Sequence, residues 1–404
     1  MICAFVFYGM HTENNRKRIH QEIFWLCKII VCITSVLAVV GLILAFFNVR
    51  GEYSNEFLGI EKYRLIIYEN RFTGLYTNPN LLGFVSVVSI LACHILSKEN
   101  FLKHSFKPKQ SKAFLITALV LNVISLFLSD SNGGLLLLGC YIVFNFLYKL
   151  FRWHEKISIK DLLVRTFKFI VVVLCVGAVL LSSRTVTQIV FSLTSNFVTN
   201  NIIEKDLYNS SPYNKTPEEE SEPPTTFDHK NHNVDSGRLQ LLEESAVFIA
   251  KHPLFGIGKA NIVDFGEVYL EKGLHFSDFH NGYLTIIVSS GLVGFIMFVA
   301  FSLKICRHIV KSLFLERRDL SYTVFPLIFA FLCAYCVYAV IEKTLVYEQT
   351  FMVVMFWYML GYASMFIKKY NHIDEKVDMS ALFKGNTNTQ TSVYDVPTSD
   401  ELEE

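Results

Sequence analysis

Asp235-Ser-Gly-Arg238, His252-Pro-Leu-Phe-Gly-Ile-Gly258 and His275-Phe-Ser-Asp-Phe-His280-Asn281 lie in one polar interval, residues 184 to 281, of an otherwise apolar chain. Of the 404 residues, 52% are hydrophobic and only 18% are charged. This composition is too apolar for a soluble domain of that length and is typical of a protein that crosses a membrane repeatedly. We therefore expect an all-α, polytopic transmembrane helix bundle whose long extracytoplasmic loop carries an amphipathic helix.

Apolar windows long enough to cross a bilayer predict the spans on both sides of this loop. They cover residues 24–48, 81–97, 113–129, 134–151, 168–184, 283–304, 322–341 and 350–367. The resulting organisation is an N-terminal bundle of five full spans at 1–184, the outer loop at 185–282 and C-terminal transmembrane helices at 283–368. Residues 1–10 read as a truncated first helix, and the polar tail at 369–404 is expected to be disordered and cytoplasmic.

Basic residues occupy every second loop, at 16–18, 98–112, 149–168, 307–318 and 368–369. The positive-inside rule assigns these loops to the cytoplasm. The loops at about 49–80, 129–134 and 185–282, and the short piece around residues 342–343, then face outward. The sequence thus predicts that the polar segments share the outer face of a cell membrane.

The outer loop divides into two parts of different character. Residues 205–233 contain four prolines and three consecutive glutamates, which predicts a flexible insertion. From Asp235 the apolar residues Leu239, Leu242, Ala246 and Ile249 recur at helical spacing, and the residue before Pro253 ends the pattern. We expect an amphipathic helix here that rests on the bundle or the lipid surface.

Several classes of function are disfavoured by composition and motif. A net charge of +1 lacks the basic excess of a nucleic-acid-binding protein. The nine cysteines avoid the polar loop, so a disulfide framework is not expected, and no phosphate-binding P-loop is present. The histidines show no metal-ligand spacing, so we expect neither a metal nor another cofactor.

Polar residues at the outer helix ends are the candidate site. Arg71, just before Asn78-Pro79-Asn80, is either an interfacial anchor or a guanidinium that pairs with phosphate oxygens, and Asn80 is a candidate helix cap. In the turn 130–134 the glycines are expected to make the reversal, while Asp130 could bind a sugar hydroxyl or orient an arginine.

A histidine also approaches this face. His280, followed by Asn281, precedes the helix with Gly291 and Gly294, whose small residues favour close helix packing. It is either structural or a base that activates an acceptor hydroxyl.

The order of these motifs resembles the O-antigen ligase and polysaccharide polymerase superfamily of bacterial envelopes. The motifs are R-x-T-G-x-x-x-N-P-N at 71–80, Ser-Asn-Gly-Gly at 131–134, G-R at 237–238, H-P-x-x-G-I-G at 252–258, H-N-x-Y-L at 280–284 and G-L-x-G at 291–294. The chain departs from the pattern in two places. The superfamily often has an arginine after the serine of the turn, where this chain has Asn132, and the acidic insertion belongs to no such pattern.

The resemblance implies a metal-independent glycosyltransferase of the bacterial cytoplasmic membrane that uses an undecaprenyl-pyrophosphate-linked glycan outside the cell. It implies that Arg71 and Arg238 bind the pyrophosphate and that His280, with Arg238, is catalytic. Asp130, Asn281 and Asn80 are candidate acceptor-binding or positioning residues. Expected partners are the lipid-linked glycan, membrane lipid and envelope polysaccharide assembly proteins.

Polymerisation of repeat units into a capsular or O-antigen-like surface polysaccharide is the favoured activity. Three alternatives remain at this point. Ligase-type transfer to a lipid or wall acceptor differs only in the acceptor. A transporter or flippase for lipid-linked oligosaccharide would need polar groups within its membrane-spanning helices. The third alternative is a purely structural or sensory membrane protein.

Overall fold

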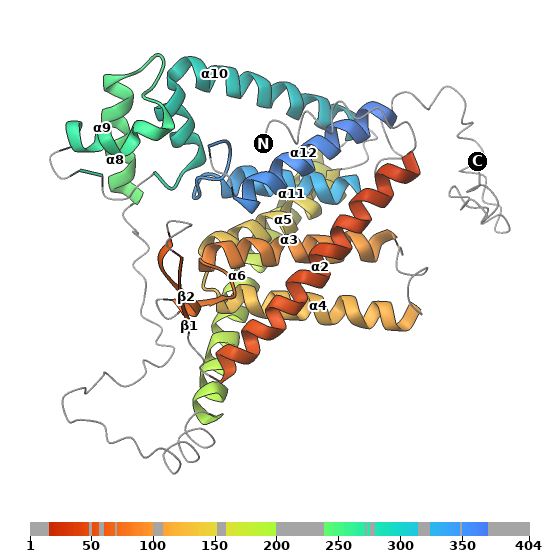
Figure 1. The fold of residues 1–404 in the computed structure, drawn as a ribbon. Helices are drawn as coiled ribbons and strands as arrows, with labels where there is room; N and C mark the ends of the chain where they lie inside the picture. The colour runs from red at the N-terminus through yellow and green to blue at the C-terminus, as the bar shows by residue number, and fades with distance from the viewer. Residues whose placement is uncertain are drawn as a thin grey trace, which may run out of the picture.

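The computed structural model describes residues 16–47, 51–55, 60–68, 71–99, 108–151, 159–198, 238–270, 273–274, 279–313, 324–347 and 350–370 (Figure 1). The predicted insertion at 205–233, the segment 1–10 and nearly all of the tail at 369–404 lie outside these residues, as does His275.

Helices dominate the described chain, which confirms the all-α polytopic fold. Each apolar window coincides with a helix: α2 (Arg16–Phe46), α3 (Pro79–Glu99), α4 (Pro108–Leu128), α5 (Asn132–Phe151), α6 (Ile159–Val198), α10 (Gly282–Lys311), α11 (Phe325–Tyr338) and α12 (Phe351–Tyr370). Five of them, namely α2, α3, α5, α6 and α10, are long and apolar enough to cross a membrane. The apolar parts of α4, α11 and α12 are shorter.

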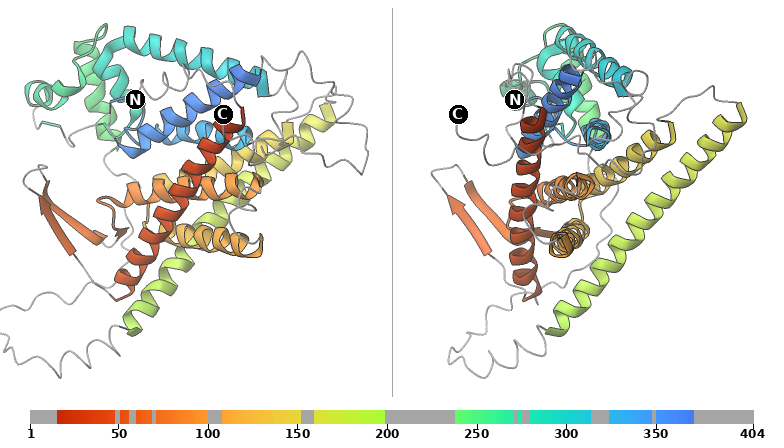
Figure 2. Two further views of the ribbon diagram at one scale, coloured as in Figure 1. Left: turned by 45° about the vertical axis from the view of Figure 1, so that its right-hand side comes forward. Right: turned by 90° about the vertical axis from the view of Figure 1, so that its right-hand side faces the viewer.

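The structure differs from the expected boundary of the outer loop. The loop was expected to begin at residue 185, but α6 continues without interruption to Val198. The right-hand view of Figure 2 shows this helix along the edge of the bundle, and no residue in its most apolar stretch is buried in the protein. Residues 185–198 of the expected loop are therefore helical, because a helix can continue past an apolar stretch while its backbone stays hydrogen-bonded.

A small antiparallel sheet, which the sequence pattern did not predict, precedes α3. It orders β1 (Gly51–Asn55), β2 (Ile60–Tyr68) and β3 (Arg71–Gly74) consecutively. Buried Ile66, Ile67 and Phe72 pack with Ala45 of α2 and Leu82 of α3. The sheet therefore fixes Arg71, the first residue of β3, beside the end of α2 and the start of α3.

Aromatic side chains from distant parts of the sequence fill the centre of the bundle. Phe84 of α3 stacks on Tyr338 of α11 with ring centroids 5.9 Å apart, and Tyr335 stacks on Phe356 of α12 at 4.5 Å. These rings are all less than one-tenth exposed. Burial of such large rings contributes strongly to stability, so α3, α11 and α12 form the inner layer of the fold.

Glycines bring the first turns of α3 and α5 into close contact. A Cβ atom added to Gly134 would lie 3.0 Å from the Gly83 Cα atom, and one added to Gly83 would lie 2.7 Å from the Ser131 Cβ atom. Gly133 and Gly134 belong to the first turn of α5 and have no positive φ. The expectation that these glycines make the reversal is wrong: they allow two helices to approach, and the left-handed residue of the turn is Asp130, with φ 52°.

The outer unit consists of α8 (Arg238–Lys251), the short helix η4 (Lys259–Asn261), α9 (Ile262–Tyr269) and the start of α10 (Figure 1). Its apolar core contains Leu241, Phe248, Ile257, Phe279 and Val288. The amphipathic helix predicted from the 235–251 pattern is thus present as α8. It packs against α10 rather than standing alone.

A break in α10 receives the segment between α8 and η4. Gly291 has φ 65° and ψ −172°, which interrupts the helix. Four main-chain hydrogen bonds cross the break: Ile257 N to Val288 O, Gly258 N to Ser289 O, Leu292 N to Pro253 O and Val293 N to Leu254 O, all between 2.8 and 3.2 Å. Gly291 therefore provides a main-chain clamp, defined as these four bonds. It does not act only as the small helix-packing residue that was expected.

Candidate functional site

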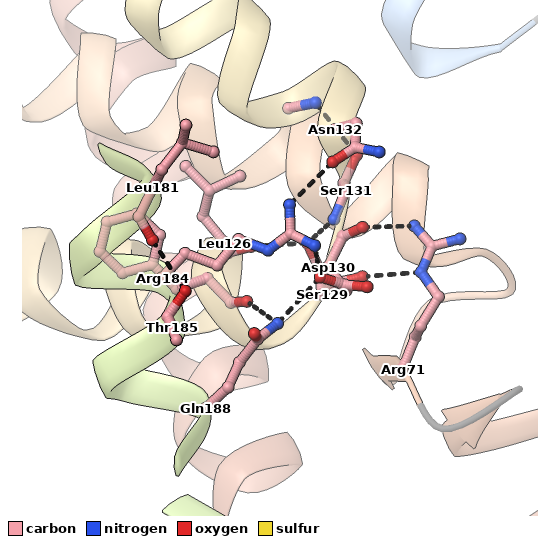
Figure 3. Close-up of polar contacts among 12 residues, drawn as sticks. Arg71, Leu126, Ser129, Asp130, Ser131, Asn132, Leu181, Arg184, Thr185 and Gln188 are labelled. Carbon is pink, nitrogen blue, oxygen red and sulfur yellow. Dashed lines mark hydrogen bonds and ion pairs between the residues drawn. The ribbon is translucent and has the colours of Figure 1, made fainter. Parts of the chain in front are cut away.

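Arg71 lies where the sheet meets the turn between α4 and α5, and three acceptors hold its guanidinium group. Figure 3 shows two of them, the carbonyls of Ser129 and Asp130. The Nε of Arg71 donates to the Ser129 carbonyl at 3.1 Å, and its Nη2 donates to the Asp130 carbonyl at 3.1 Å. These carbonyls follow α4, where the last carbonyls of a helix lack helical partners. The guanidinium is thus fixed in place by the turn between α4 and α5.

Asn80 connects this arginine to another part of the chain. Its Oδ1 accepts from Arg71 Nη2 at 2.9 Å and from Ser131 Oγ at 3.2 Å, while its Nδ2 donates to Glu342 Oε1 at 3.0 Å. The expectation that Asn80 caps α3 is wrong. Asn78 accepts from the Asn80 amide at 2.7 Å, and Pro79 takes the first helical position, as proline favours.

Asp130 pairs with an arginine that the sequence interpretation did not assign to the site. Its carboxylate forms an ion pair with Arg184 of α6 and accepts from Gln188 Nε2 at 2.9 Å (Figure 3). Arg184 Nη1 also donates to Asn132 Oδ1 at 2.7 Å. The expectation that Asp130 orients an arginine agrees with this geometry, although the arginine comes from α6.

Arg184 and Gln188 were missed because the fifth span was ended at residue 184. The available signal was their spacing of four residues, which places both on one face of a helix if that helix continues. With the helix extended to Val198, both side chains reach the turn after α4.

Glu342 is a buried carboxylate that was also missed. It is 8% exposed and accepts from Asn80 through its side chain. The Gly282 amide donates to two main-chain carbonyl oxygens, that of Glu342 at 3.0 Å and that of Ala339 at 2.8 Å. Because carboxylates are rarely buried without partners, the position of Glu342 next to the start of α10 marks it as part of the site. A lone glutamate in a short loop gave no such signal in the sequence.

His280 and Asn281 stand at the start of α10. Asn281 is the N-cap, since its Oδ1 accepts from the Tyr283 and Leu284 amides at 2.9 and 3.0 Å. His280 has φ 43°, a conformation that costs energy for a non-glycine residue and is maintained only by its surroundings. Those surroundings include buried Phe279, whose ring lies 5.8 Å from the Phe248 ring of α8.

Arg238 is the first residue of α8, in the same outer unit as His280. Its side chain lies outside the described part of the structure, so its predicted contact with pyrophosphate stays a prediction. Within the residues that the structure does describe, no three histidine, cysteine or carboxylate side chains gather as metal ligands would.

The structure joins Arg71, Asn80 and Asp130, three of the six expected site residues, into one hydrogen-bonded path. Arg71 contacts Asn80 and the main chain of Asp130, Asn80 contacts Glu342, and Glu342 accepts from Gly282, two residues after His280. We call these residues, with Arg184 and Gln188, the outer cluster. Its charged side chains are two arginines, Arg71 and Arg184, and two carboxylates, Asp130 and Glu342. Hydrogen bonds and an ion pair hold both guanidinium groups beside the turn between α4 and α5.

Comparison with known families gives one match. Residues 117–299 match the family model described as O-antigen ligase, which covers α4 to the first part of α10 and includes Asp130, Arg184, Arg238 and His280. No curated protein and no solved structure matches the chain. The match confirms the resemblance on which the sequence interpretation relied, and it indicates a multi-pass bacterial membrane protein of a glycan-transferring class.

Proposed function

We propose that this chain, whose residues 117–299 match the O-antigen ligase family model, polymerises oligosaccharide repeat units carried on undecaprenyl pyrophosphate. The product is a surface polysaccharide of the capsular or O-antigen type. The reaction takes place at the outer cluster, on the extracytoplasmic side of the membrane.

The hydrogen-bonded path from Arg71 through Asn80 and Glu342 to Gly282 carries this proposal. It ties the segment 71–80 to Glu342, which lies 262 residues after Asn80, and through Glu342 to the loop that bears His280. A site that cleaves a glycosyl pyrophosphate needs cationic donors near a proton acceptor. The path supports this arrangement, because it connects Arg71 through hydrogen bonds to the segment that carries His280, at one end of the bundle.

The proposed chemistry follows from these groups. The acceptor hydroxyl oxygen forms a bond to the anomeric carbon of the donor while the bond from that carbon to the pyrophosphate oxygen breaks. His280 takes the hydroxyl proton, and the lipid pyrophosphate leaves with the bonding electron pair. Arg71 and Arg238 neutralise the charge that develops on the leaving group, and a guanidinium held beforehand does so with little reorganisation.

The first test is the rate of bond formation by the purified full chain supplied with a labelled lipid-pyrophosphate repeat unit. We expect His280→Ala to lower this rate about 10²–10⁴-fold, the usual contribution of a positioned base, and Arg238→Ala to lower it comparably. His308→Ala, at the exposed far end of the same helix α10, is the matched control and should keep wild-type activity. Normal polymer from both site variants would refute the assignment of these residues.

The acceptor distinguishes polymerase from ligase in the same assay. Glycans on the lipid carrier whose length increases by whole repeat units support polymerisation. A single transfer of the glycan to an added lipid or wall acceptor supports ligase activity instead. Movement of the lipid-linked unit across a vesicle membrane without new glycosidic bonds would instead identify a flippase and overturn the proposal.

A further inference from the structure

A cavity lies between α4 and α5, where both helices pack on α3. Its volume is about 570 Å³, and it is lined by residues of α3, α4 and α5 with Leu180 of α6. Cavities of this size hold small organic ligands. The proposed reaction uses none of its residues.

The lining changes from polar to apolar along the cavity. His94 and Ser97 lie in the last part of α3, Lys112 in the first turns of α4 and Asn145 in the second half of α5. Since α4 runs opposite to α3 and α5, these polar residues share one end of the bundle, away from Asn80 and Asp130. Towards the other end the lining is apolar, with Val123, Phe127, Leu138 and Leu180.

The polar end is positively charged. Lys112 lines it and is exposed. Lys98 lies one helical turn after His94 on α3, and Lys149 lies one turn after Asn145 on α5, so both exposed lysines belong to the same end of the helices as the cavity's polar residues. None of the described lining residues is acidic. This end joins the basic loops that the positive-inside rule assigns to the cytoplasm.

The apolar part opens sideways to the membrane. Ile116, Leu119 and Ile142 line the cavity and are 52%, 37% and 37% exposed. Within the cavity, His94 Nδ1 and Tyr141 Oη share a hydrogen bond of 2.8 Å, which satisfies both groups beside the hydrocarbon surface. A ligand can therefore enter from the lipid phase without crossing a polar barrier.

We propose that this cavity binds an anionic glycerophospholipid of the cytoplasmic leaflet. The phosphate lies among Lys98, Lys112 and Lys149, and an acyl chain follows the apolar lining between α4 and α5. Basic pockets between membrane helices recognise anionic lipid head groups in this way, through charge at the surface and apolar contact below it. The phosphate end of the site lies at the opposite end of the helices from Asn80 and Asp130, and the proposed glycan transfer uses none of the residues that line the cavity.

The experiment measures retention of phosphatidylglycerol and phosphatidylcholine by the detergent-purified full chain, using native mass spectrometry. The wild-type chain should retain phosphatidylglycerol in preference to phosphatidylcholine. Lys112→Gln combined with Lys149→Gln should weaken phosphatidylglycerol binding about thirtyfold, as expected for the loss of two lysines near a lipid phosphate. Lys304→Gln combined with Arg307→Gln removes the same charge from exposed positions at the matching end of α10, outside this cavity, and should retain the lipid.

A photoreactive phosphatidylglycerol provides a second measurement that needs no variant. Its acyl chain should cross-link to peptides of α4 and α5. The proposal would be overturned if the wild-type chain retained both lipids equally, or if the two variant pairs lost phosphatidylglycerol binding to the same extent. Cross-links confined to other helices would also overturn it. Stronger retention of a polyprenyl phosphate than of phosphatidylglycerol would overturn it as well.

Discussion

At the scale of single residues, Asp130 combines two roles that are usually separate. Its main chain takes the left-handed turn between α4 and α5, and its carboxylate binds Arg184 and Gln188. Aspartate and asparagine tolerate this backbone conformation better than most residues. Asp130 can therefore turn the chain and neutralise Arg184 at the same position.

Replacement of Asp130 by Asn separates these roles. Asparagine keeps the tolerance for positive φ but removes the charge that pairs with Arg184, whose side chain is only 17% exposed. We expect the free energy of unfolding to fall by about 1–3 kcal/mol, as for other partly buried charged hydrogen bonds. The measurement is the thermal midpoint of the purified protein in detergent.

Asp264→Asn on α9 is the control for this experiment, because that side chain is exposed. Its midpoint should match the wild type. An unchanged midpoint in Asp130→Asn would show that the ion pair adds nothing to stability.

At the scale of elements, the main-chain clamp decides where the outer unit lies. Gly291 gives α10 a break at which Pro253, Leu254, Ile257 and Gly258 all find main-chain partners. Side chains at these positions make no contribution to the four bonds. The clamp therefore depends on backbone conformation, above all that of Gly291.

The substitution Gly291→Ala tests the clamp. An added Cβ would lie 2.3 Å from the Leu254 carbonyl oxygen, and alanine disfavours φ 65°. We expect a loss of about 2–4 kcal/mol of stability, from backbone strain and overpacking together, and faster proteolysis between α8 and α10. Limited proteolysis and the thermal midpoint report the two effects.

Gly177→Ala on α6 is the matched control, since a Cβ there meets no atom within 4 Å. It should leave stability unchanged or raise it by up to about 1 kcal/mol, because alanine favours the helix. If Gly291→Ala and Gly177→Ala had the same thermal midpoint and the same rate of proteolysis, the helix break at Gly291 would not have the role described here.

At the scale of the whole molecule, the sequence predicted the helices well and the site in part. Long apolar windows identify helices because the hydrocarbon leaves few other ways to satisfy the backbone. The pairing of β2 with β3 and the bond from Asn80 to Glu342 were not predictable, because they join residues through tertiary packing. The same holds for Arg184, whose role became clear only when α6 was seen to continue past the apolar window.

The orientation of the molecule is a further prediction at this scale. Thr77 is exposed beside the outer cluster, and Lys304 is exposed near the opposite end of α10. In a variant without native cysteines, a membrane-impermeant maleimide added to intact spheroplasts should label Thr77→Cys and not Lys304→Cys. Permeabilisation should make both reactive, and labelling of Lys304→Cys alone before permeabilisation would reverse the topology.

The clamp at Gly291 has a practical consequence for protein engineering. Because α8 and the segment after it are anchored to α10 by their own main chain, the connection from Val198 to Arg238 does not have to hold them. An affinity tag or a fluorescent domain inserted within residues 205–233 would leave all four bonds intact. That segment is the place to attach a reporter without disturbing the outer cluster.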